Sequence, residues 1–276
     1  MSVASLKISF IGGGNMATAL IGGLLRQGAS AANISVVEPF EAARAKLTQD
    51  FGVACTAAPG AGVAASELIV MAVKPQNMRE AAAAVAPQLK QQLVLSIAAG
   101  TRVADLSRWL GGHPAIVRTM PNTPALIGMG ITGMFAASAV STAQRAAAEQ
   151  VLRAVGDVVW VNDEALLDPV TAISGSGPAY VFYFLEALAE AGVKLGLNAA
   201  DAKRLALATF AGAAKLAADS PDDFATLRTK VTSKGGTTAA ALAVMAARQV
   251  KEAIIAAAEA ASARGREMGE QLGRDH

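Results

Sequence analysis

A glycine-rich segment near the amino terminus has the residue types that bind a dinucleotide. The apolar run 6–11 leads directly into residues 12–17, GGGNMA, a G-x-G-x-x-A pattern. Gly12 would permit a tight turn, Gly14 would let the backbone approach a pyrophosphate, and small Ala17 would allow close packing of helix on strand. The phosphates would lie at the helix amino terminus, where free N–H groups favour an anion.

Charged residues follow two later apolar runs. Glu38 comes after the run 34–37, at roughly the ~20-residue distance from the glycines at which an acidic side chain usually meets the adenosine ribose. It could accept a hydrogen bond from the 2′-hydroxyl of NADH and repel the 2′-phosphate of NADPH, a repulsion that Arg44 could counter. Its simpler interpretation is a solvated strand end. Lys74 follows the run 68–73, where ligands bind in open sheets, and its alternative is an exposed turn.

Three more segments combine hydroxyl or amide side chains with glycine or proline. In 118–124, RTMPNTP, two prolines would stiffen a loop that carries Asn122. In 174–180, SGSGPAY, Pro178 suits the first turn of a helix. In 232–238, TSKGGTT, hydroxyls and exposed N–H groups would form a cradle for a small carboxylate. Each has a structural alternative, which is respectively a turn, a tightly packed helix start, and a threonine N-cap after a glycine turn.

The elements around these motifs alternate in the first half of the chain. Continuous apolar runs predict buried parallel strands, and the amphipathic or alanine-rich stretches between them predict helices. That alternation is typical of a doubly wound, Rossmann-type α/β sheet. The expected strands are 6–11, 34–37, 68–73, 93–97, 115–118 and 158–161, and the expected helices are 16–27, 39–50 and 142–154, with a Pro- and Gly-rich stretch at 121–133.

The sequence pattern changes from Asn162 onward, because strand-like apolar runs are no longer found there. We therefore place a domain boundary near 161–164, between a domain of residues 1–162 and an all-α domain of residues 163–276. The predicted helix 199–218 carries Leu205, Leu207, Phe210 and Leu216 on several of its sides, which favours an obligate dimer. The expected helices are 179–195, 199–218, 224–230, 238–247 and 249–268.

The composition of the chain limits the classes of molecule that the protein is expected to bind. The formal charge is +2 from 24 basic and 22 acidic residues, and neither sign forms a long run, so neither a nucleic-acid nor a membrane partner is expected. A single cysteine, Cys55, excludes an intrachain disulfide and makes a thiolate metal cage impossible. The sequence shows no signal-peptide pattern, and charged Arg248, Lys251 and Glu252 interrupt its last apolar stretch. We expect a cytoplasmic protein without a metal site.

Taken together, these segments resemble the pyrroline-5-carboxylate reductase family over essentially the whole chain. The matching motifs, in the family's order and approximate spacing, are GxGNMA at 12–17, VKP at 73–75, MPNTP at 120–124, SGSGPAY at 174–180 and SxGGTT at 233–238. The resemblance implies a Rossmann-type amino-terminal domain and a helical domain that binds substrate and pairs two subunits, with rings of dimers common. It implies reduction of a small cyclic imine, 1-pyrroline-5-carboxylate, to L-proline by NADPH or NADH, which is the last step of proline synthesis.

The resemblance also implies roles for individual residues. Gly12, Gly14, Asn15, Met16 and Ala17 would contact the phosphate portion of the cofactor, and Lys74 and Ala99 would lie nearer its nicotinamide. Glu38 and Asn122 are the other candidate cofactor-binding residues. Glu164 matches an acidic position near the substrate. Many members carry Pro where this chain has Lys234, which puts the stiffness of that loop in doubt more than its activity. The residues matching the loop that holds the substrate carboxylate and ring nitrogen are Ser233, Gly236, Thr237 and Thr238.

Catalysis in such a chain would rest on orientation and one hydrogen bond. The two histidines, His113 and His276, lie outside all the motifs, and a cyclic imine can take its proton from water. Thr238 is the candidate for a hydrogen bond to the ring nitrogen. A β-hydroxyacid dehydrogenase is an alternative enzyme class. Such enzymes carry a catalytic lysine, with an asparagine nearby, on the helix after a glycine-rich turn, and in this chain no lysine follows that turn until Lys194. A nucleotide sensor without catalytic activity is the other alternative.

Overall fold

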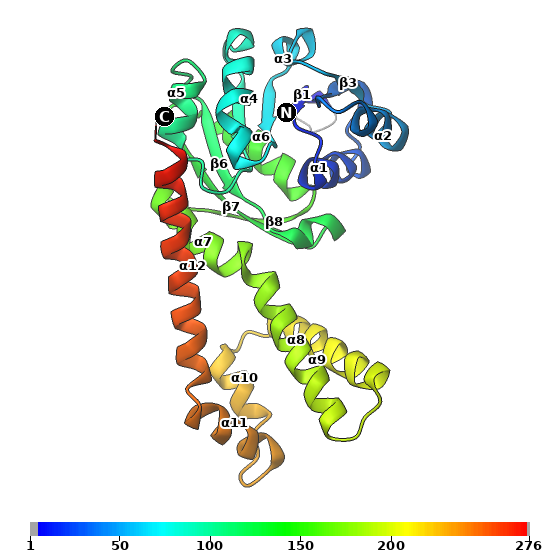
Figure 1. Cartoon of the computed structure of the whole chain (residues 1–276), viewed down its shortest axis with the longest axis vertical. Coiled ribbons are helices and arrows are strands. Elements are labelled where there is room, and N and C mark those ends of the chain that lie inside the picture. The colour runs from blue at the N-terminus through cyan, green and yellow to red at the C-terminus, as the bar shows by residue number, and fades with distance from the viewer. Residues whose placement is uncertain (1–4, 275–276) are drawn as a thin grey trace. The chain divides into compact units, whose positions relative to one another are not determined.

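An eight-stranded sheet organises the first 160 residues within the described range 5–274 of the computed structural model (Figure 1). The strand order is β3-β2-β1-β4-β5-β6-β7-β8. All neighbours pair in parallel except β6 and β7, which are antiparallel. The strands are β1 (Ile8–Ile11), β2 (Ile34–Val37), β3 (Ala54–Thr56), β4 (Leu68–Met71), β5 (Leu93–Ser96), β6 (Ile116–Met120), β7 (Gly130–Ala136) and β8 (Gly156–Trp160).

The strand register brings the ends of the central strands to one level. Ile11 of β1 is paired with Val37 of β2 on one side and with Met71 of β4 on the other. The chain leaves β1 toward β2, whereas β4 lies on the opposite side of β1. The order therefore reverses at β1, and a crevice for ligands opens at the carboxyl ends of the strands at such a point.

Alternating strand residues feed two separate apolar cores. On one face, Phe10 packs with the helices α1 (Asn15–Arg26), α2 (Glu41–Phe51) and α6 (Thr142–Arg153). On the other face, Met71 packs with residues of α3 (Ala61–Ala65), α4 (Met78–Val85) and α5 (Val103–Trp109). Helices on both faces confirm the doubly wound class expected from the continuous apolar strands.

Short helical turns connect the larger elements. Some of the proline-containing motifs of the sequence lie in these turns, because proline suits the first turn of a helix. They are η2 (Ala31–Asn33), η3 (Pro75–Asn77), η4 (Ala86–Gln88), η5 (Thr123–Ile127), η6 (Glu164–Leu166), α7 (Leu167–Val170) and the π-turn η7 (Thr171–Gly175).

The chain divides into two compact units. We call the first the sheet unit, which runs to Ser176 and takes in the chain from Ala260 onward, and the second the helical unit, 177–259. The predicted boundary near 161–164 coincides with the end of β8 but differs from this division. The segment 163–176 and the end of the last helix belong to the sheet unit in this division, so the predicted domain limits at 162 and 163 stay a prediction.

The helical unit contains α8 (Gly177–Lys194), α9 (Ala199–Asp219), α10 (Phe224–Lys230), α11 (Thr237–Ala247) and the start of α12 (Val250–Leu272). Helices α8 and α9 pair closely. A Cβ on Gly192 would lie 2.8 Å from the Cβ of Ala202, and the rings of Phe184 and Phe210 are 6.4 Å apart. Within 177–259, which is described throughout, only Ala202 and Ala206 are buried.

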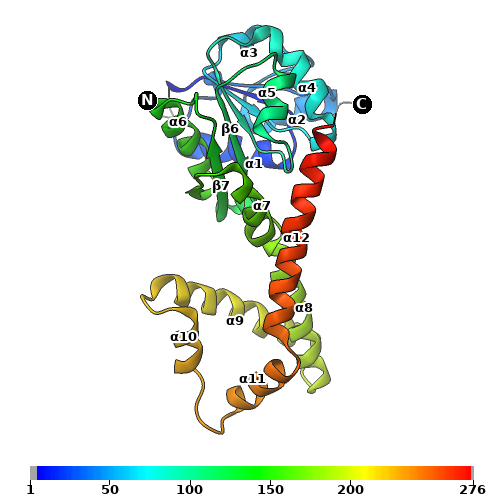
Figure 2. The same ribbon diagram turned by 90° about the vertical axis from the view of Figure 1, so that its left-hand side faces the viewer.

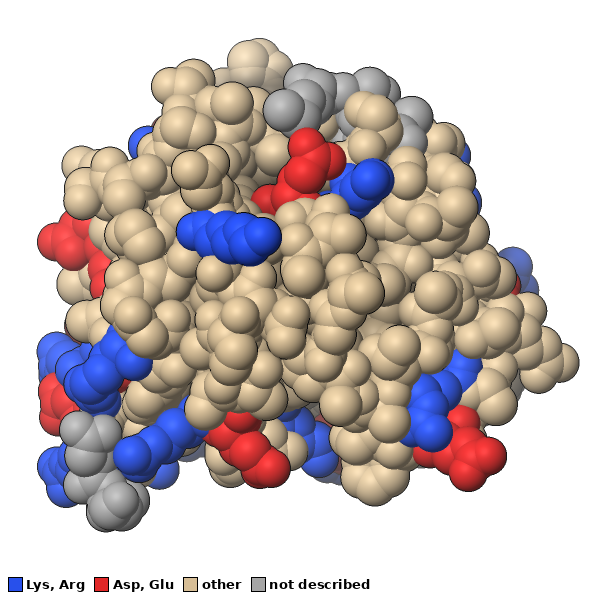
Figure 3. Space-filling model, turned by 90° about the horizontal axis from the view of Figure 1, so that it is seen from above, with Lys and Arg blue, Asp and Glu red and all other residues tan. Residues whose placement is uncertain are grey.

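Two strands escaped the sequence-based prediction. Strand β7 lies largely inside the stretch 121–133 taken as a Pro- and Gly-rich connection, and β3 has only three residues. The six expected strands are all present, with ends shifted by a few residues at most. None of the described helices is long and apolar enough to cross a membrane. On the face shown in Figure 3, basic and acidic side chains of the described residues are interspersed among uncharged ones.

Close packing of α1 gives a first prediction. A Cβ on Gly23 would clash with the Ala154 backbone, whose carbonyl carbon would lie only 2.9 Å away. Backbone cannot swing aside as a side chain can, so Gly23→Ala should lower the free energy of unfolding by about 1–3 kcal/mol. Urea unfolding measures this change.

Its control lies one residue earlier in the same helix. A Cβ on Gly22 would meet only the ends of Arg26 and Phe51, each at 3.4 Å. Gly22→Ala should therefore be neutral or stabilising by up to ~1 kcal/mol through helix propensity. Equal losses in the two variants would show that the contact with Ala154 is not the cause.

Candidate functional site

The residues predicted to bind a cofactor lie at the carboxyl edge of the sheet. The glycine segment follows β1, Lys74 follows β4, Ala99 follows β5 and Asn122 follows β6. These four strands are adjacent and parallel, so the residues that follow them leave the sheet at the same edge. The structure thus brings together motifs that are separated by more than 100 residues in sequence.

Gly12 and Gly14, which precede α1, are glycine for different physical reasons. Gly12 has a φ of +98°, and a Cβ there would lie 2.8 Å from the Ala72 carbonyl oxygen. Gly14 is the N-cap of α1 and is exposed, and a Cβ there would find no atom within 4 Å. Gly12 is thus required by the fold, whereas the absent side chain of Gly14 leaves open space at the amino end of a helix. That space fits a phosphate, because no side chain caps the first-turn N–H groups.

The side chains after Gly14 divide between surface and core. Asn15 is exposed and Met16 is half-buried, so neither side chain is enclosed in the core. Ala17 is buried against the sheet, as its small size predicted. The glycine loop is therefore a rigid turn on a packed base, rather than a flexible connection.

Glu38 is held inward against the glycine loop. Its Oε2 accepts a hydrogen bond from the Gly13 N–H at 2.9 Å, and its Oε1 accepts one from the Phe40 N–H at 3.1 Å. The residue is only 8% exposed, so the alternative interpretation of a solvated strand end is wrong. Arg44 lies beside it and donates from Nη1 to the carbonyl oxygens of Glu38 and Pro39, at 2.9 and 2.7 Å. Carboxylate and guanidinium are thus both fixed next to the glycines.

The other residues of this edge are arranged as follows. Lys74 is exposed, and its carbonyl accepts the Asn77 N–H at the start of a 3₁₀ turn. Ala99 is half-buried in the loop between β5 and α5. Asn122 Oδ1 accepts the Ile131 N–H at 2.9 Å, so this side chain ties its own loop to the start of β7. Rigidity of that loop therefore comes from Asn122 as well as from its prolines.

A buried arginine in the middle of β6 connects the sheet to the segment that includes α7. Arg118 Nη1 donates to Glu164 Oε1 at 2.9 Å, and Nη2 lies 3.8 Å from Asp168 Oδ1. The same Glu164 oxygen accepts the Val103 N–H at 2.8 Å, at the first residue of α5. Glu164, predicted to lie near the substrate, thus has a structural task as well. Sequence reasoning assigned no role to Arg118 or Asp168, because nothing local marks a charged residue as buried.

Burial dominates the electrostatics of this cluster. Loss of hydration raises the pKa of the Asp168 carboxyl, and the positive charges of Arg118, Arg102 and Arg266 oppose that rise only in part. Asp168 lies beside α12, since a Cβ on Gly265 would be 3.7 Å from its Oδ1. Helices α7 and α12 run side by side in both ribbon views (Figure 1, Figure 2).

The loop before α11 belongs to the helical unit and is described by itself. Gly235 has a φ of +72°, and the Gly236 N–H donates to the Ser233 carbonyl at 3.1 Å. The N-cap of α11 is Gly236, so the alternative interpretation of a threonine N-cap is wrong. Thr237 is exposed and Thr238 is half-buried. The turn therefore presents hydroxyls and a glycine-capped helix start on one short segment.

Two other features bear on the chemistry. Helix α8 begins at Gly177, so Pro178 stands in its first turn as predicted. A Cβ on Gly175 would lie 2.5 Å from Met120 Cε, which shows tight packing just before that helix. Among residues 5–274, no group of three or more His, Cys, Asp or Glu side chains is placed to hold a metal ion.

Comparison with known proteins adds two family matches. Residues 164–268 match the family described as pyrroline-5-carboxylate reductase dimerisation. Residues 7–100 match the family described as NADP oxidoreductase, coenzyme F420-dependent. One match lies in the α/β part of the chain and the other in the helical part.

Full-length relatives carry a consistent name. Pyrroline-5-carboxylate reductase of Pseudomonas aeruginosa is 46% identical over 269 residues, covering 97% of this chain and 98% of the relative. The Haemophilus influenzae protein of the same name is 44% identical, covering 95% and 97%. Among solved structures, pyrroline-5-carboxylate reductase of Coxiella burnetii has a TM-score of 0.91 at 37% identity, covering 96% and 98%. The Plasmodium falciparum pyrroline carboxylate reductase with NADP bound has a TM-score of 0.86 at 29% identity, covering 96% and 99%.

The raised pKa of Asp168 gives a stability prediction with a defined sign. Because the folded protein holds this proton more tightly than the unfolded chain, the stabilising contribution is present below the ordinary pKa of 3.8 and is lost as the pH rises through the folded pKa. Relative to wild type, Asp168→Asn should gain stability as the pH is raised from below that value to neutrality. Urea unfolding midpoints of both proteins across this range measure the difference.

Asp157 provides a control of opposite sign. Its pKa is lowered by a hydrogen bond from the Val158 N–H and further by Arg153, so its stabilising contribution is present above its ordinary pKa and is lost as the pH falls through the folded pKa. Asp157→Asn should therefore lose stability toward neutral pH. A trend of the same sign in both variants would contradict the role given to burial at Asp168.

Proposed function

Because the chain belongs to the pyrroline-5-carboxylate reductase family, we propose that it reduces 1-pyrroline-5-carboxylate to L-proline with hydride from NADPH or NADH, the last step of proline synthesis. The observation that carries this function is the full-length match to relatives of that name. The test is oxidation of NADPH when the imine is added. A β-hydroxyacid dehydrogenase would instead reduce the oxidised cofactor with a hydroxyacid, and a nucleotide sensor would bind NADPH without turnover.

The carboxyl edge of the sheet is the proposed cofactor site. The open space at Gly14 fits a pyrophosphate, and Gly12, Asn15, Met16 and Ala17 shape or border that space. Lys74, Ala99 and Asn122 would contact the cofactor farther along the edge, toward the nicotinamide. When bound, the nicotinamide supplies the hydride. The relative with NADP bound and the match to an NADP oxidoreductase family support this use of the edge.

The proposed substrate loop is the turn before α11. Its exposed backbone and hydroxyls at Ser233, Gly236 and Thr237 suit a small carboxylate. Thr238 would donate a hydrogen bond to the ring nitrogen, and water can supply the proton that makes the imine carbon a good hydride acceptor. Glu164 is proposed to add a negative charge near the substrate, where its Oε1 is already held by Arg118 and Val103. Catalysis then rests on orientation rather than on a strong acid.

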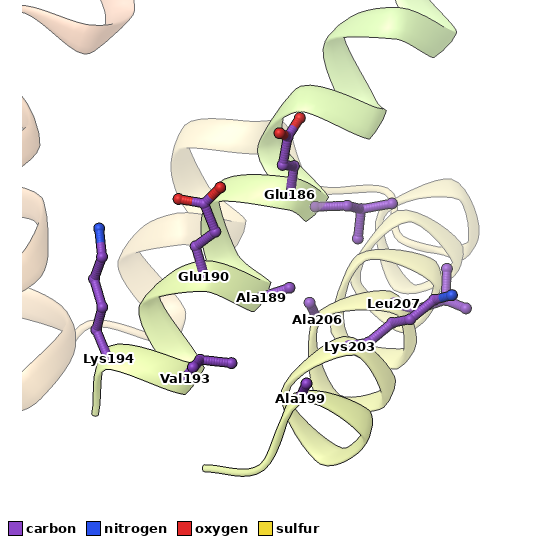
Figure 4. A pocket seen from close by; sticks show the side chains of 10 residues that line it. Glu186, Ala189, Glu190, Val193, Lys194, Ala199, Lys203, Ala206 and Leu207 are labelled. Carbon is purple, nitrogen blue, oxygen red and sulfur yellow. The ribbon is translucent and has the colours of Figure 1, made fainter. Parts of the chain in front are cut away.

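The helical unit forms an oligomer, and we propose that it pairs two subunits. Its large apolar side chains are widely exposed, including Leu195 at 86% and Phe224 at 81%. A groove of about 640 Å³ lies along α8 and α9. Figure 4 shows Ala189 and Ala206 facing each other across it, while Glu186 and Glu190 point away. A ring of dimers and a cytoplasmic location also remain proposals.

Removal of the Thr238 hydroxyl is predicted to slow turnover without loss of cofactor binding. Loss of one hydrogen bond to a developing amine should cost on the order of 1.5–3 kcal/mol, or about 10- to 100-fold in kcat/KM for the imine. Steady-state kinetics of Thr238→Ala and NADPH titration by fluorescence measure the two effects. In the control, Thr229→Ala, the lost hydroxyl bonds only to Ala225 within α10, and kcat/KM should stay at the wild-type value. Unchanged kinetics in Thr238→Ala would exclude Thr238 as the donor.

Glu38 is predicted to set the balance between the two cofactors. At about 4 Å and an effective dielectric of ~20, two like unit charges repel by a few kcal/mol, and the buried carboxylate is held in place by Gly13 and Phe40. Both cofactors should work, with NADH used relatively well for this family. Glu38→Ser should shift the ratio of kcat/KM values toward NADPH by about tenfold or more.

Two further variants test the charge explanation. Glu38→Gln retains a hydrogen-bond acceptor for the Gly13 N–H but removes the charge, so it should shift the ratio in the same direction. Glu41→Ser removes an exposed carboxylate at the start of α2 and should leave the ratio unchanged. If Glu38→Gln keeps the wild-type ratio, repulsion by Glu38 does not determine cofactor choice.

The exposed apolar surface predicts a dimer at micromolar concentration. Leu207 lines the groove and is 54% exposed, so Leu207→Asp should weaken pairing by placing a charge in an apolar interface. Sedimentation velocity measures the shift toward monomer. Leu126→Asp is the control, since Leu126 is similarly exposed at 51% but belongs to the sheet unit. A folded, active wild-type monomer at that concentration would refute the pairing.

A further inference from the structure

The last turns of α12 pack against the loop that follows β5. A Cβ on Gly269 would lie 3.1 Å from the Gly100 carbonyl oxygen and 3.1 Å from Arg102 Nε. Conversely, a Cβ on Gly100 would lie 3.1 Å from Leu272 Cδ1. Gly269 is the one buried residue of α12, all of whose residues are described. Helix and loop are therefore in direct backbone contact, which a side chain at residue 269 would break.

Polar contacts surround this packing. Arg102 Nη2 donates to the Arg266 carbonyl at 3.4 Å and lies 3.5 Å from Glu270. Arg108 donates to the Gly273 carbonyl at 2.8 Å, which fastens the end of α12 to α5. These partners are half-exposed, so each pair contributes little by itself. Their effect is to set where the helix end lies on the loop.

The same loop is held at its other side by the sheet. Thr119 Oγ1 donates to the Ser96 carbonyl at 2.9 Å, and Glu164 accepts the Val103 N–H at 2.8 Å. Within the loop, Thr101 Oγ1 is buried without a hydrogen-bond partner among the described residues, at a cost of about 1–3 kcal/mol. A segment that carries such a cost keeps its conformation only when its surroundings impose it. The loop 97–102 is thus clamped between β6, Glu164 and α12.

We propose that Gly269 is a positioning residue for hydride transfer, acting through the loop 97–102. This inference rests on the proposed function, in which Ala99 of that loop lies near the nicotinamide. Residue 269 touches neither substrate nor cofactor. Because residue 269 has no side chain, α12 can pack directly on the Gly100 backbone and so determine the position of that backbone at the carboxyl edge of the sheet. A displacement of the order of 1 Å at such a point can cost about 100-fold in rate.

A graded series of variants tests the proposal. Gly269→Ala requires a shift of a few tenths of an ångström, and Gly269→Val requires more, because two further methyl groups must fit beside the loop. The single-turnover rate of hydride transfer, with imine and NADPH saturating, should fall in the order wild type, Ala, Val, reaching about tenfold in Val. The dissociation constant of NADPH should rise by less than about threefold, since the phosphates bind at a different strand.

Gly265→Ala is the matched control. It replaces a glycine one turn earlier in the same helix, where a Cβ would meet only Asp168 at 3.7 Å or more, so its rate should equal that of wild type. Hydrogen–deuterium exchange of the proteins without cofactor provides a readout besides activity. Amide exchange in 97–103 should speed up in Gly269→Val and not in Gly265→Ala.

The outcomes separate this inference from the function on which it rests. A wild-type protein that does not oxidise NADPH with the imine would overturn the proposed function. An active wild type with equal transfer rates in Gly269→Val and Gly265→Ala would overturn the positioning role alone. If Gly269→Val does not fold, the milder Gly269→Ala decides by the same comparison.

Discussion

Arg118 lies in the middle of the buried strand β6 with only 7% of its side chain exposed, and a cation in that position must be paired. Loss of one partner from such a buried pair costs roughly 3–5 kcal/mol, whereas an exposed ion pair is worth about 0–1 kcal/mol. The requirement fixes Glu164 and brings Asp168 close by, so the chain after β8 must return to the sheet before it can enter the helical unit. Through Glu164 the same charge fixes the start of α5, and with it one end of the loop 97–102.

At the opposite end of the carboxyl edge, a buried negative charge plays the part that the positive charge of Arg118 plays here. There a buried carboxylate, Glu38, accepts two backbone N–H groups and fixes the glycine loop, while Arg44 binds carbonyl oxygens beside it. In both places a charged side chain organises backbone. The edge on which a cofactor would lie is therefore rigid at its phosphate end and at its nicotinamide end, and orientation is what an imine reduction without a strong acid needs most.

Local features of the sequence were enough to predict much of this arrangement. The glycine motif, the buried parallel strands and the helical second half all follow from patterns that span a few residues, and the structure contains them. Strand β7 was missed because glycines and prolines precede it and it contains glycines itself, and because it forms the one antiparallel pair of the described sheet, with β6. The inward position of Glu38 and the pairing of Arg118 depend on neighbours distant in sequence, for which a single chain carries no local mark. The contact of α12 with Gly100 is of the same kind, since it joins residues about 170 positions apart.

That contact also has a consequence for the order of folding during synthesis. The sheet unit is discontinuous, because residues 260–274 belong to it and contact the loop after β5 and helix α5, both of which are synthesised before the helical unit. The core of the sheet can form early, since its strands and covering helices are contiguous in sequence. The loop after β5, however, obtains its last packing partner only when residues 266–273 of α12 and its end have left the ribosome. Domains commonly fold from the amino terminus as they emerge. In this chain the loop 97–102, which we propose to lie near the nicotinamide, is completed last, so a chain that stops before α12 would form the glycine loop but leave this loop without its last packing partner.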